Sequence, residues 1–191
     1  MKSLKNNKST VSGKFVVFIG FISFTFAAFF FLLSQFLSET LDSPAFSFFL
    51  LIFIILFGIA ADVIGTSVAA ADEAPFHAKA SKKVVGAREG VFLIRNADRV
   101  ANIANDVIGD IAGTVSGALG IALALQIMTL REDLNRFVLN MMITALIAAF
   151  TVGGKAYGKK IALSNSNGVI FFAGRIIAAF SSITGIGLVK K

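Results

Sequence analysis

Long apolar runs alternate with short polar segments along the chain. Four of these runs are long enough to cross a bilayer, which takes about 20 residues of α-helix. They cover residues 15–37, 46–71, about 100–130 and about 137–154. The pattern predicts an all-α integral membrane protein with four transmembrane helices.

Two other segments combine apolar and basic residues. Segment 72–99 alternates short apolar groups with Lys and Arg, which is typical of a helix that lies on lipid headgroups. Segment 168–189 is long enough to span but carries Arg175 in its first half, and a charge at the bilayer centre costs about 2.5–3.5 kcal/mol. We therefore predict cytoplasmic amphipathic juxtamembrane helices over about 73–95 and about 165–188, with a fifth span over 168–189 as the alternative.

The distribution of Lys and Arg predicts the orientation in the membrane. Residues 1–14 contain four lysines and segment 72–99 contains six basic residues, whereas residues 38–45 contain none. Because cytoplasmic loops are enriched in Lys and Arg, we expect both termini in the cytoplasm and the protein in the plasma (inner) membrane. The first apolar run is longer than the roughly 7–15 residues of a signal peptide, so we expect it to be a retained helix.

The type of apolar residue changes along the chain. Phe dominates the first run and the start of the second, whereas Ala and Gly dominate from about residue 58 onward. Bulky Phe suits a lipid-facing surface, and small residues let helices approach closely. We therefore divide the chain into a basic cytoplasmic tail (1–14), an additional N-terminal transmembrane helix (15–37) and a membrane domain (46–191) that holds the functional core.

Composition excludes several classes of function. Hydrophobic residues make up 56 % of the chain, and its net charge of +7 comes from basic residues in short segments between apolar runs, so the charge indicates topology and not nucleic-acid binding. The chain has no Cys and a single histidine, His77, which cannot form a zinc site by itself. Neither a phosphate-binding loop nor a hydrolase elbow is found. We expect neither an enzyme nor a bound organic cofactor.

Polar residues and glycines gather on one face of the third predicted span. At about 100° per residue, one arc of the helix holds Asn102, Asp106, Gly109, Asp110, Gly113, Gly117 and Gly120. The opposite face holds Ile108, Ile111, Val115 and Leu119, which suit lipid or hydrophobic neighbours. Glycines at this spacing allow close helix packing, and acids inside a membrane usually mark an ion pathway or a proton relay. The face could instead be a simple packing seam, and Asp106 could lie near the headgroups.

Oxygen-bearing side chains in the second span complete a candidate ion site. Carboxylates, hydroxyls and carbonyls are hard donors that suit Mg²⁺, Ca²⁺ or Mn²⁺. A helix break at the Gly153–Gly154 doublet would expose backbone carbonyls there. The predicted metal ligands are Asp62, Thr66, Ser67, Asn105, Asp106, Asp110 and Gly154. The alternative for the two hydroxyls is a bond to the preceding helical turn.

From about residue 55 to 180, the order of these features resembles the transmembrane domain of the CorC/CNNM family of magnesium and divalent-cation transporters. The corresponding positions are Thr66-Ser67, Gly86-Ala87-Arg88, Asn96-Ala97-Asp98-Arg99, Ile108-Gly109-Asp110 and Gly153-Gly154 with Lys155 or Lys159. The resemblance implies a homodimeric domain that transports a divalent cation, Mg²⁺ above all. It also implies that the ion binds at mid-membrane between the second, third and fourth spans.

The chain also departs from the family pattern. Val68 and Gly154 stand where the family has Glu, and Tyr157 or Gly158 stands where it has Pro. We expect a divergent form that lacks the cytoplasmic nucleotide-binding domains, so that regulation would come from a separate subunit or from ion gradients. Either Asp62, Asp106 and Asp110 replace the missing charge, or the protein is a relict without transport. The pattern also fits a scaffold or accessory subunit that packs through the Gly-rich third span, and it fits a proton-coupled carrier.

Overall fold

The computed structural model describes residues 13–41, 43–131 and 133–185, and within these ranges the chain forms helices and turns without any strand. The helices are α1 (Gly13–Leu41), α2 (Pro44–Ala70), α3 (Ala74–Ser81), α4 (Ala87–Arg95), α5 (Ala97–Ala101), η1 (Asn102–Gly109), α6 (Asp110–Leu130), α7 (Arg136–Ser164) and α8 (Ser166–Thr184). The prediction of an all-α chain is confirmed. Most of the predicted basic tail, 1–14, lies outside the described residues.

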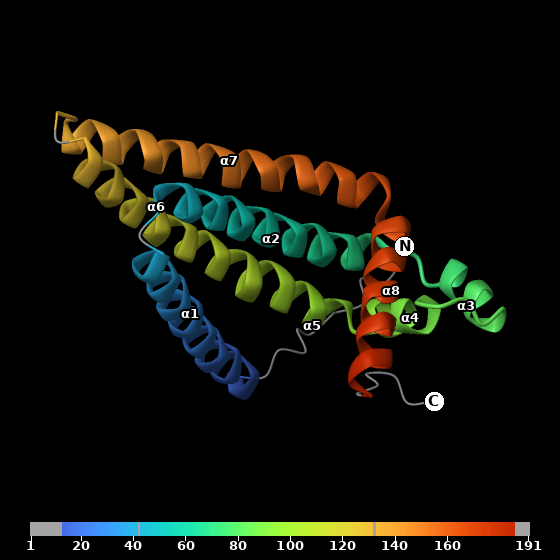
Figure 1. The fold of residues 1–191 in the computed structure, drawn as a ribbon. Coiled ribbons are helices and arrows are strands. Elements are labelled where there is room, and N and C mark those ends of the chain that lie inside the picture. Colours follow the sequence, from blue (N-terminus) through green and yellow to red (C-terminus); the bar gives the residue numbers. More distant parts are fainter. Residues whose placement is uncertain (1–12, 42, 132, 186–191) are drawn as a thin grey trace.

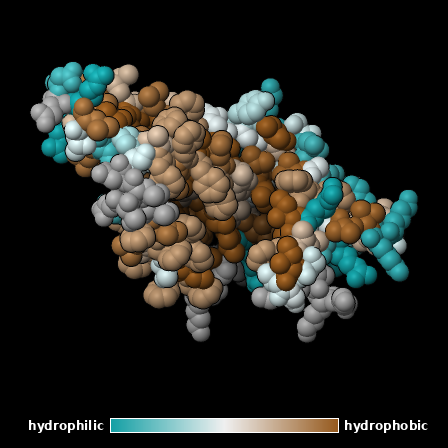
Figure 2. Space-filling view, in the orientation of Figure 1, coloured by the Kyte–Doolittle hydropathy of each residue, from teal (hydrophilic) through white to brown (hydrophobic). Residues whose placement is uncertain are grey.

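In the part of the chain that the structure describes, five helices are long and apolar enough to cross a membrane: α1, α2, the continuous rod α5–η1–α6, α7 and α8. The molecule is apolar in its middle and polar at its two ends, as Figure 2 shows for one face. These features agree with an integral membrane protein. The rod begins at Ala97 and α7 continues to Ser164, so both helices extend beyond the apolar runs from which they were predicted.

Local sequence signals explain where several helices begin. Pro44 stands in the first turn of α2 after an extended Ser43, a position where the missing N–H of proline costs nothing. The Asn135 side chain accepts hydrogen bonds from the backbone N–H groups of Phe137 and Val138 at the start of α7. Asn165 caps α8 in the same way. Side-chain caps of this kind satisfy backbone donors that the helix itself leaves free.

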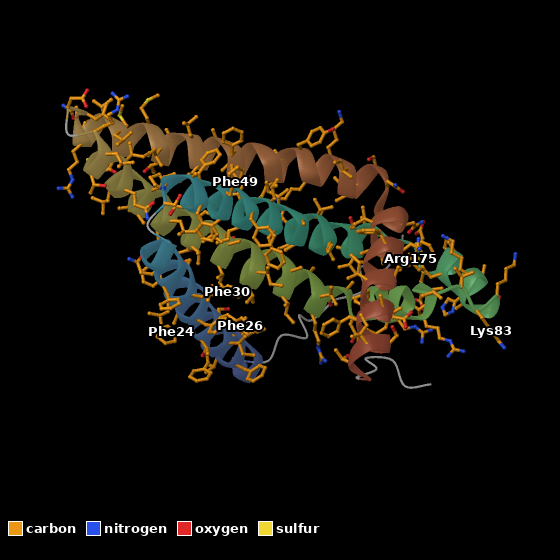
Figure 3. The ribbon with its side chains drawn as sticks, viewed as in Figure 1. Phe24, Phe26, Phe30, Phe49, Lys83 and Arg175 are labelled. Carbon is orange, nitrogen blue, oxygen red and sulfur yellow. The ribbon has the colours of Figure 1, made fainter. Side chains whose placement is uncertain are left out.

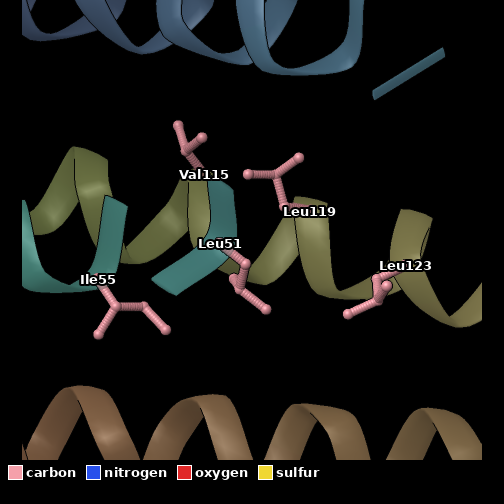
Figure 4. Packing of buried hydrophobic residues seen from close by; sticks show 5 residues of the cluster. All are labelled: Leu51, Ile55, Val115, Leu119 and Leu123. Atoms are coloured by element: carbon pink, nitrogen blue, oxygen red, sulfur yellow. The ribbon is translucent and has the colours of Figure 1, made fainter. Parts of the chain in front are cut away.

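Helix α2 lies at the centre of the bundle. It packs against the α5–η1–α6 rod on one side and against α7 on the other (Figure 1). Leu51 and Ile55 of α2 form a buried cluster with Val115, Leu119 and Leu123 of α6 (Figure 4). Val115 and Leu119 belong to the face predicted for lipid or hydrophobic neighbours. Both pack in this cluster with α2, and Val115 also lines a crevice beside α1.

Helix α1 contacts mainly α6, near the connection to α2, and diverges from the bundle toward its own N-terminus (Figure 1). The most apolar stretch of its candidate span, Val16–Phe36, contains no buried residue, whereas a third of the corresponding stretch of α2 is buried. The prediction of a peripheral, Phe-rich first helix agrees with this arrangement.

The helices α3, α4 and α8 form a layer across one end of the bundle, and α8 runs crosswise to α2 and α7 (Figure 1). Val68 at the end of α2 packs with Phe76, Leu93, Ile170 and Ala173 from this layer. The layer thus has a hydrophobic core of its own, built around the last turns of α2. We refer to it below as the α3–α4–α8 layer.

A turn divides the helix predicted over about 73–95 into α3 and α4. Lys83 has a φ of 56° and Gly86 a φ of 87°, and neither conformation fits a right-handed helix. A Cβ atom on Gly174 of α8 would collide with the carbonyl oxygen of Gly86. The backbones of the turn and of α8 are therefore in direct contact, which requires glycine at both positions.

Helix α7 is continuous through the Gly153–Gly154 doublet, so the predicted helix break is wrong. A Cβ atom on Gly154 would collide with Ile59, and one on Gly158 would lie 2.6 Å from Val63. The glycines thus allow α2 and α7 to pack closely, and this packing offsets their low helix propensity. Gly154 remains a predicted metal ligand. The prediction was based on a backbone carbonyl exposed by a helix break, and α7 has no break at this position.

Candidate cation site between α2 and η1

The third membrane helix contains a π-helical segment, η1, that covers eight residues from Asn102 to Gly109. Such segments have a wider turn than an α-helix and occur frequently at functional sites. We predicted a regular α-helix, with about 100° per residue, over residues 102–120. That prediction is wrong over η1, where the helix is π-helical. Two predicted ligands, Asn105 and Asp106, lie within it.

Glycines of α2 bring η1 and the first turn of α6 close. A Cβ atom on Gly58 would lie 2.7 Å from Cβ of Ala112, and one on Gly65 would collide with the side-chain amide of Asn105. Small residues at a helix interface allow this kind of approach. The Asn105 side chain therefore lies directly against the α2 backbone.

Asp62 lies on the same face of α2, between these two glycines. Positions 58, 62 and 65 follow the i, i+4, i+7 spacing of one helix face. Asp62 is only 5 % exposed, and among the described residues neither its Oδ2 nor Oδ1 of Asn105 has a hydrogen-bond partner. The α2–η1 interface thus holds two buried acceptor oxygens that lack a donor.

The two hydroxyl candidates occupy different sides of α2. Ser67 is completely buried, and its Oγ has no hydrogen-bond partner in the described part of the chain. The alternative of a bond to the preceding turn is therefore wrong for this residue. Ser67 follows Gly65 by two residues, or about 200° around the helix, so it does not share the face of Asp62. Thr66 is partly buried and follows Asp62 by one turn.

Asp106 and Asp110 lie at the surface of this chain. Asp110 Oδ1 accepts a hydrogen bond from Lys155 Nζ of α7 at 3.4 Å, and the two side chains are 73 % and 22 % exposed. Asp106 is exposed as well. These two acids therefore differ from Asp62, which is buried. The pairing with Lys155 was not predicted, although this lysine directly follows the Gly153–Gly154 doublet.

The glycines of the third helix do not form one continuous seam. A Cβ atom on Gly120 would collide with Ile147 of α7, and one on Gly109 would lie 3.4 Å from Lys155 Nζ. At Gly113 and Gly117, by contrast, it would meet no other described atom within 4 Å. Two glycines therefore serve packing within the chain, and Gly113 and Gly117 form an open face.

The donor set is poor in carboxylates. Within residues 13–41, 43–131 and 133–185, no group of three or more His, Cys, Asp or Glu side chains could hold a metal ion. The α2–η1 interface contributes one carboxylate and one amide oxygen. Such a set can bind a hydrated hard cation, because Mg²⁺ keeps several of its waters and uses only one or two carboxylates.

A separate polar cluster joins α3 to α4. Glu73 Oε1 accepts a hydrogen bond of 2.6 Å from Arg95 Nε and shares one of 2.7 Å with His77 Nε2. The hydrogen bond with Arg95 has the largest effect and the one with His77 the next largest; together they hold the pKa of Glu73 below its usual value of 4.5. All three side chains are exposed or partly exposed. The cluster therefore serves to hold two short helices together.

Comparisons with protein-family models, curated proteins and solved structures find no match to this chain. The class of protein consequently rests on the chain's own features. These are membrane-length helices and a buried acid at a close helix interface. They define a helical membrane protein with a polar site inside its bundle.

Proposed function

We propose that this protein is a membrane transport domain for a divalent cation, with Mg²⁺ as the leading candidate. The observation that carries the proposal is the buried Asp62 carboxylate, whose Oδ2, like Oδ1 of Asn105, finds no hydrogen-bond donor among the described residues. An uncompensated buried charge is strongly destabilising. A visiting cation would supply the missing positive charge.

The ion would bind partly hydrated, because one carboxylate and one amide cannot fill an octahedral shell. Asp62 would provide the charge and Asn105 a neutral oxygen, while Thr66 and Ser67 lie on neighbouring faces of α2. Asp106 and Asp110 are exposed and would attract cations toward the bundle by their charge. The resemblance to the CorC/CNNM transmembrane domain supports the same ion and the same helices.

The topology that accompanies this proposal has four spans, with the α3–α4–α8 layer at the cytoplasmic surface. Its support is the crosswise direction of α8 (Figure 1) and the exposed Arg175 on that helix. Basic residues of the 72–99 segment favour the cytoplasmic side. We place both termini there, in the plasma membrane, and propose a homodimer with a separate regulatory subunit as a candidate partner.

Ion uptake by the purified full chain tests the proposal. In liposomes that contain a Mg²⁺-sensitive dye, Asp62→Asn should lower the uptake rate at least tenfold, because it removes the charge that holds the ion. Asp98→Asn is the matched control, since Asp98 is exposed on α5, and should transport at the parent rate. Thermal unfolding in detergent should show that both variants fold. Undiminished uptake by folded Asp62→Asn would contradict the proposal.

The open face of Gly113 and Gly117 favours a second candidate, a scaffold that packs against a partner helix. A scaffold would show no uptake in the parent protein and would lose assembly in Gly117→Leu. A proton-coupled carrier would instead show uptake that follows an imposed pH gradient. The same liposome preparation distinguishes the three functions.

A further inference from the structure

A large apolar crevice lies between α1 and the rest of the bundle. Its volume is about 660 Å³, within the roughly 300–1,000 Å³ of ligand-binding cavities. Phe18, Ile22 and Phe26 of α1 form one wall, and Phe57 of α2 and Val107 of η1 form part of the other. Figure 3 shows Phe26 and Phe30 on α1 as it passes below the bundle.

The crevice has one charged residue at its edge. Of the described residues that line it, Arg99 alone has a polar side chain. Arg99 belongs to α5, where the basic segment 72–99 ends, and Phe18 lies near the N-terminal end of α1. Both residues therefore mark the end of the crevice that our topology places at the cytoplasmic surface.

The length of the crevice matches a lipid chain. From Phe18 to Phe30 the α1 wall extends about 18 Å at 1.5 Å per residue, slightly more than half of a hydrocarbon core of about 30 Å. The crevice is open to its surroundings and its walls are almost wholly apolar, so they favour an apolar neighbour over water. In a membrane the surrounding acyl chains are the available apolar filler.

We infer that the crevice binds an anionic phospholipid of the cytoplasmic leaflet, with one acyl chain along α1 and the phosphate at Arg99. The guanidinium group suits this role because its planar fork binds phosphate oxygens in pairs. The net charge of +7 and the basic segment beside Arg99 favour an anionic headgroup over a neutral one. The inference rests on the membrane orientation proposed above, but not on cation transport.

Bound lipid would then act as a packing element of the fold. Helix α1 has few contacts with α2, and the most apolar stretch of its candidate span contains no buried residue. An acyl chain in the crevice would contact both α1 and the bundle, and would hold α1 in place. Lipid composition would consequently affect the attachment of α1.

Photolabelling of the full chain in nanodiscs tests the inference. The probe is phosphatidylglycerol with a diazirine in one acyl chain, and labelled peptides are identified by mass spectrometry. We expect adducts on crevice residues of both α1 and η1, and several-fold fewer with the corresponding phosphatidylcholine probe. Adducts spread evenly over α1, with equal yields from the two lipids, would overturn it.

Two variants with matched controls separate the acyl chain from the headgroup. Ile22→Trp fills the crevice and should lower the adduct yield at least fivefold, whereas Phe24→Trp, which changes an exposed residue of the same helix, should not. Arg99→Gln should remove the preference for phosphatidylglycerol while adducts remain in the crevice. Arg88→Gln, a change at another exposed basic residue, should keep the preference.

Further results of the labelling experiment also test the inference. Adducts that are unchanged in Ile22→Trp would overturn the inference. Asp62→Asn should be labelled like the parent, because labelling requires no Mg²⁺. Failure of the transport proposal would therefore leave this result unaffected.

Discussion

Asp62 is buried because the residues around it are small. Gly58 and Gly65 flank it on the same face of α2, and they lack the side chains that would hold α6 and η1 away. The price of this close approach is a carboxylate with little access to water, and burying a charge without a partner is costly. The spacing of the glycines on α2 therefore determines how deeply the charge of the candidate site is buried.

Replacement of Gly65 tests this connection. Gly65→Ala places a methyl group where the Asn105 amide lies, and overpacking of this kind typically costs about 1–3 kcal/mol. We expect a lower unfolding temperature in detergent and a loss of Mg²⁺ uptake. Gly153→Ala, on an exposed face of α7, meets no described atom within 4 Å and should be neutral or stabilising, by up to about 1 kcal/mol. Equal effects of the two substitutions on stability would contradict the close α2–η1 contact.

The π-helical segment η1 is the element that orients the site. Its wider turns carry Asn105 against Gly65 and leave Asp106 exposed. A single-residue deletion can convert a π-helical segment to an α-helix, because a π-bulge adds one residue to the ladder of hydrogen bonds. The packing of α6 against α2 lies outside this segment and does not depend on the added residue.

Deletion of exposed Ile103 should therefore keep the fold and change the site. We expect an unfolding temperature within a few degrees of the parent, together with loss of uptake, because the Asn105 side chain rotates away from α2. Deletion of Ile121 is the control, since this exposed residue lies in regular α-helix. That deletion shifts the register of α6 and should destabilise the protein strongly. If deletion of Ile103 were the more destabilising change, η1 would be required for folding and not for the site.

The contact between α3 and α4 should depend on pH. Since Arg95 and His77 lower the pKa of Glu73 below 4.5, the contact contributes stability above the unfolded-state pKa and loses it as pH falls through the lower, folded-state value. A spin label on Ala78→Cys should become more mobile between pH 7 and pH 3. Glu73→Gln should already be mobile at pH 7 and respond little to acid. A label that stays immobile at pH 3 would show that α3 is held by Phe76 alone.

At the scale of the whole molecule, the open Gly113–Gly117 face is the feature that a second copy would cover. Because the chain has no Cys, single introduced cysteines give unambiguous cross-links. Gly117→Cys should form a disulfide-linked dimer in membranes, whereas Ala124→Cys, at a buried position of the same helix, should not. Cross-linking through exposed positions of α7 in place of Gly117 would move the proposed interface to another face.

The sequence by itself determined the class of the protein and the approximate positions of its membrane helices. Hydropathy depends only on consecutive residues. The apolar run over 46–71 therefore predicted helix α2, Pro44–Ala70, although nothing was known of the helices that pack against it. Arg175 likewise marked α8 as different from the other long helices. These inferences required only the composition of consecutive residues.

Tertiary structure decided which polar groups meet. The π-helical turn at Asn105, the burial of Asp62 and the Lys155–Asp110 pair each depend on how distant helices pack. The crevice beside α1 depends on the angle between two helices, a quantity that no single segment encodes. A helix face is buried or exposed only relative to its neighbours. This is why the continuous stripe predicted on the third membrane helix became an exposed acid at Asp106, an ion pair at Asp110 and an open glycine face.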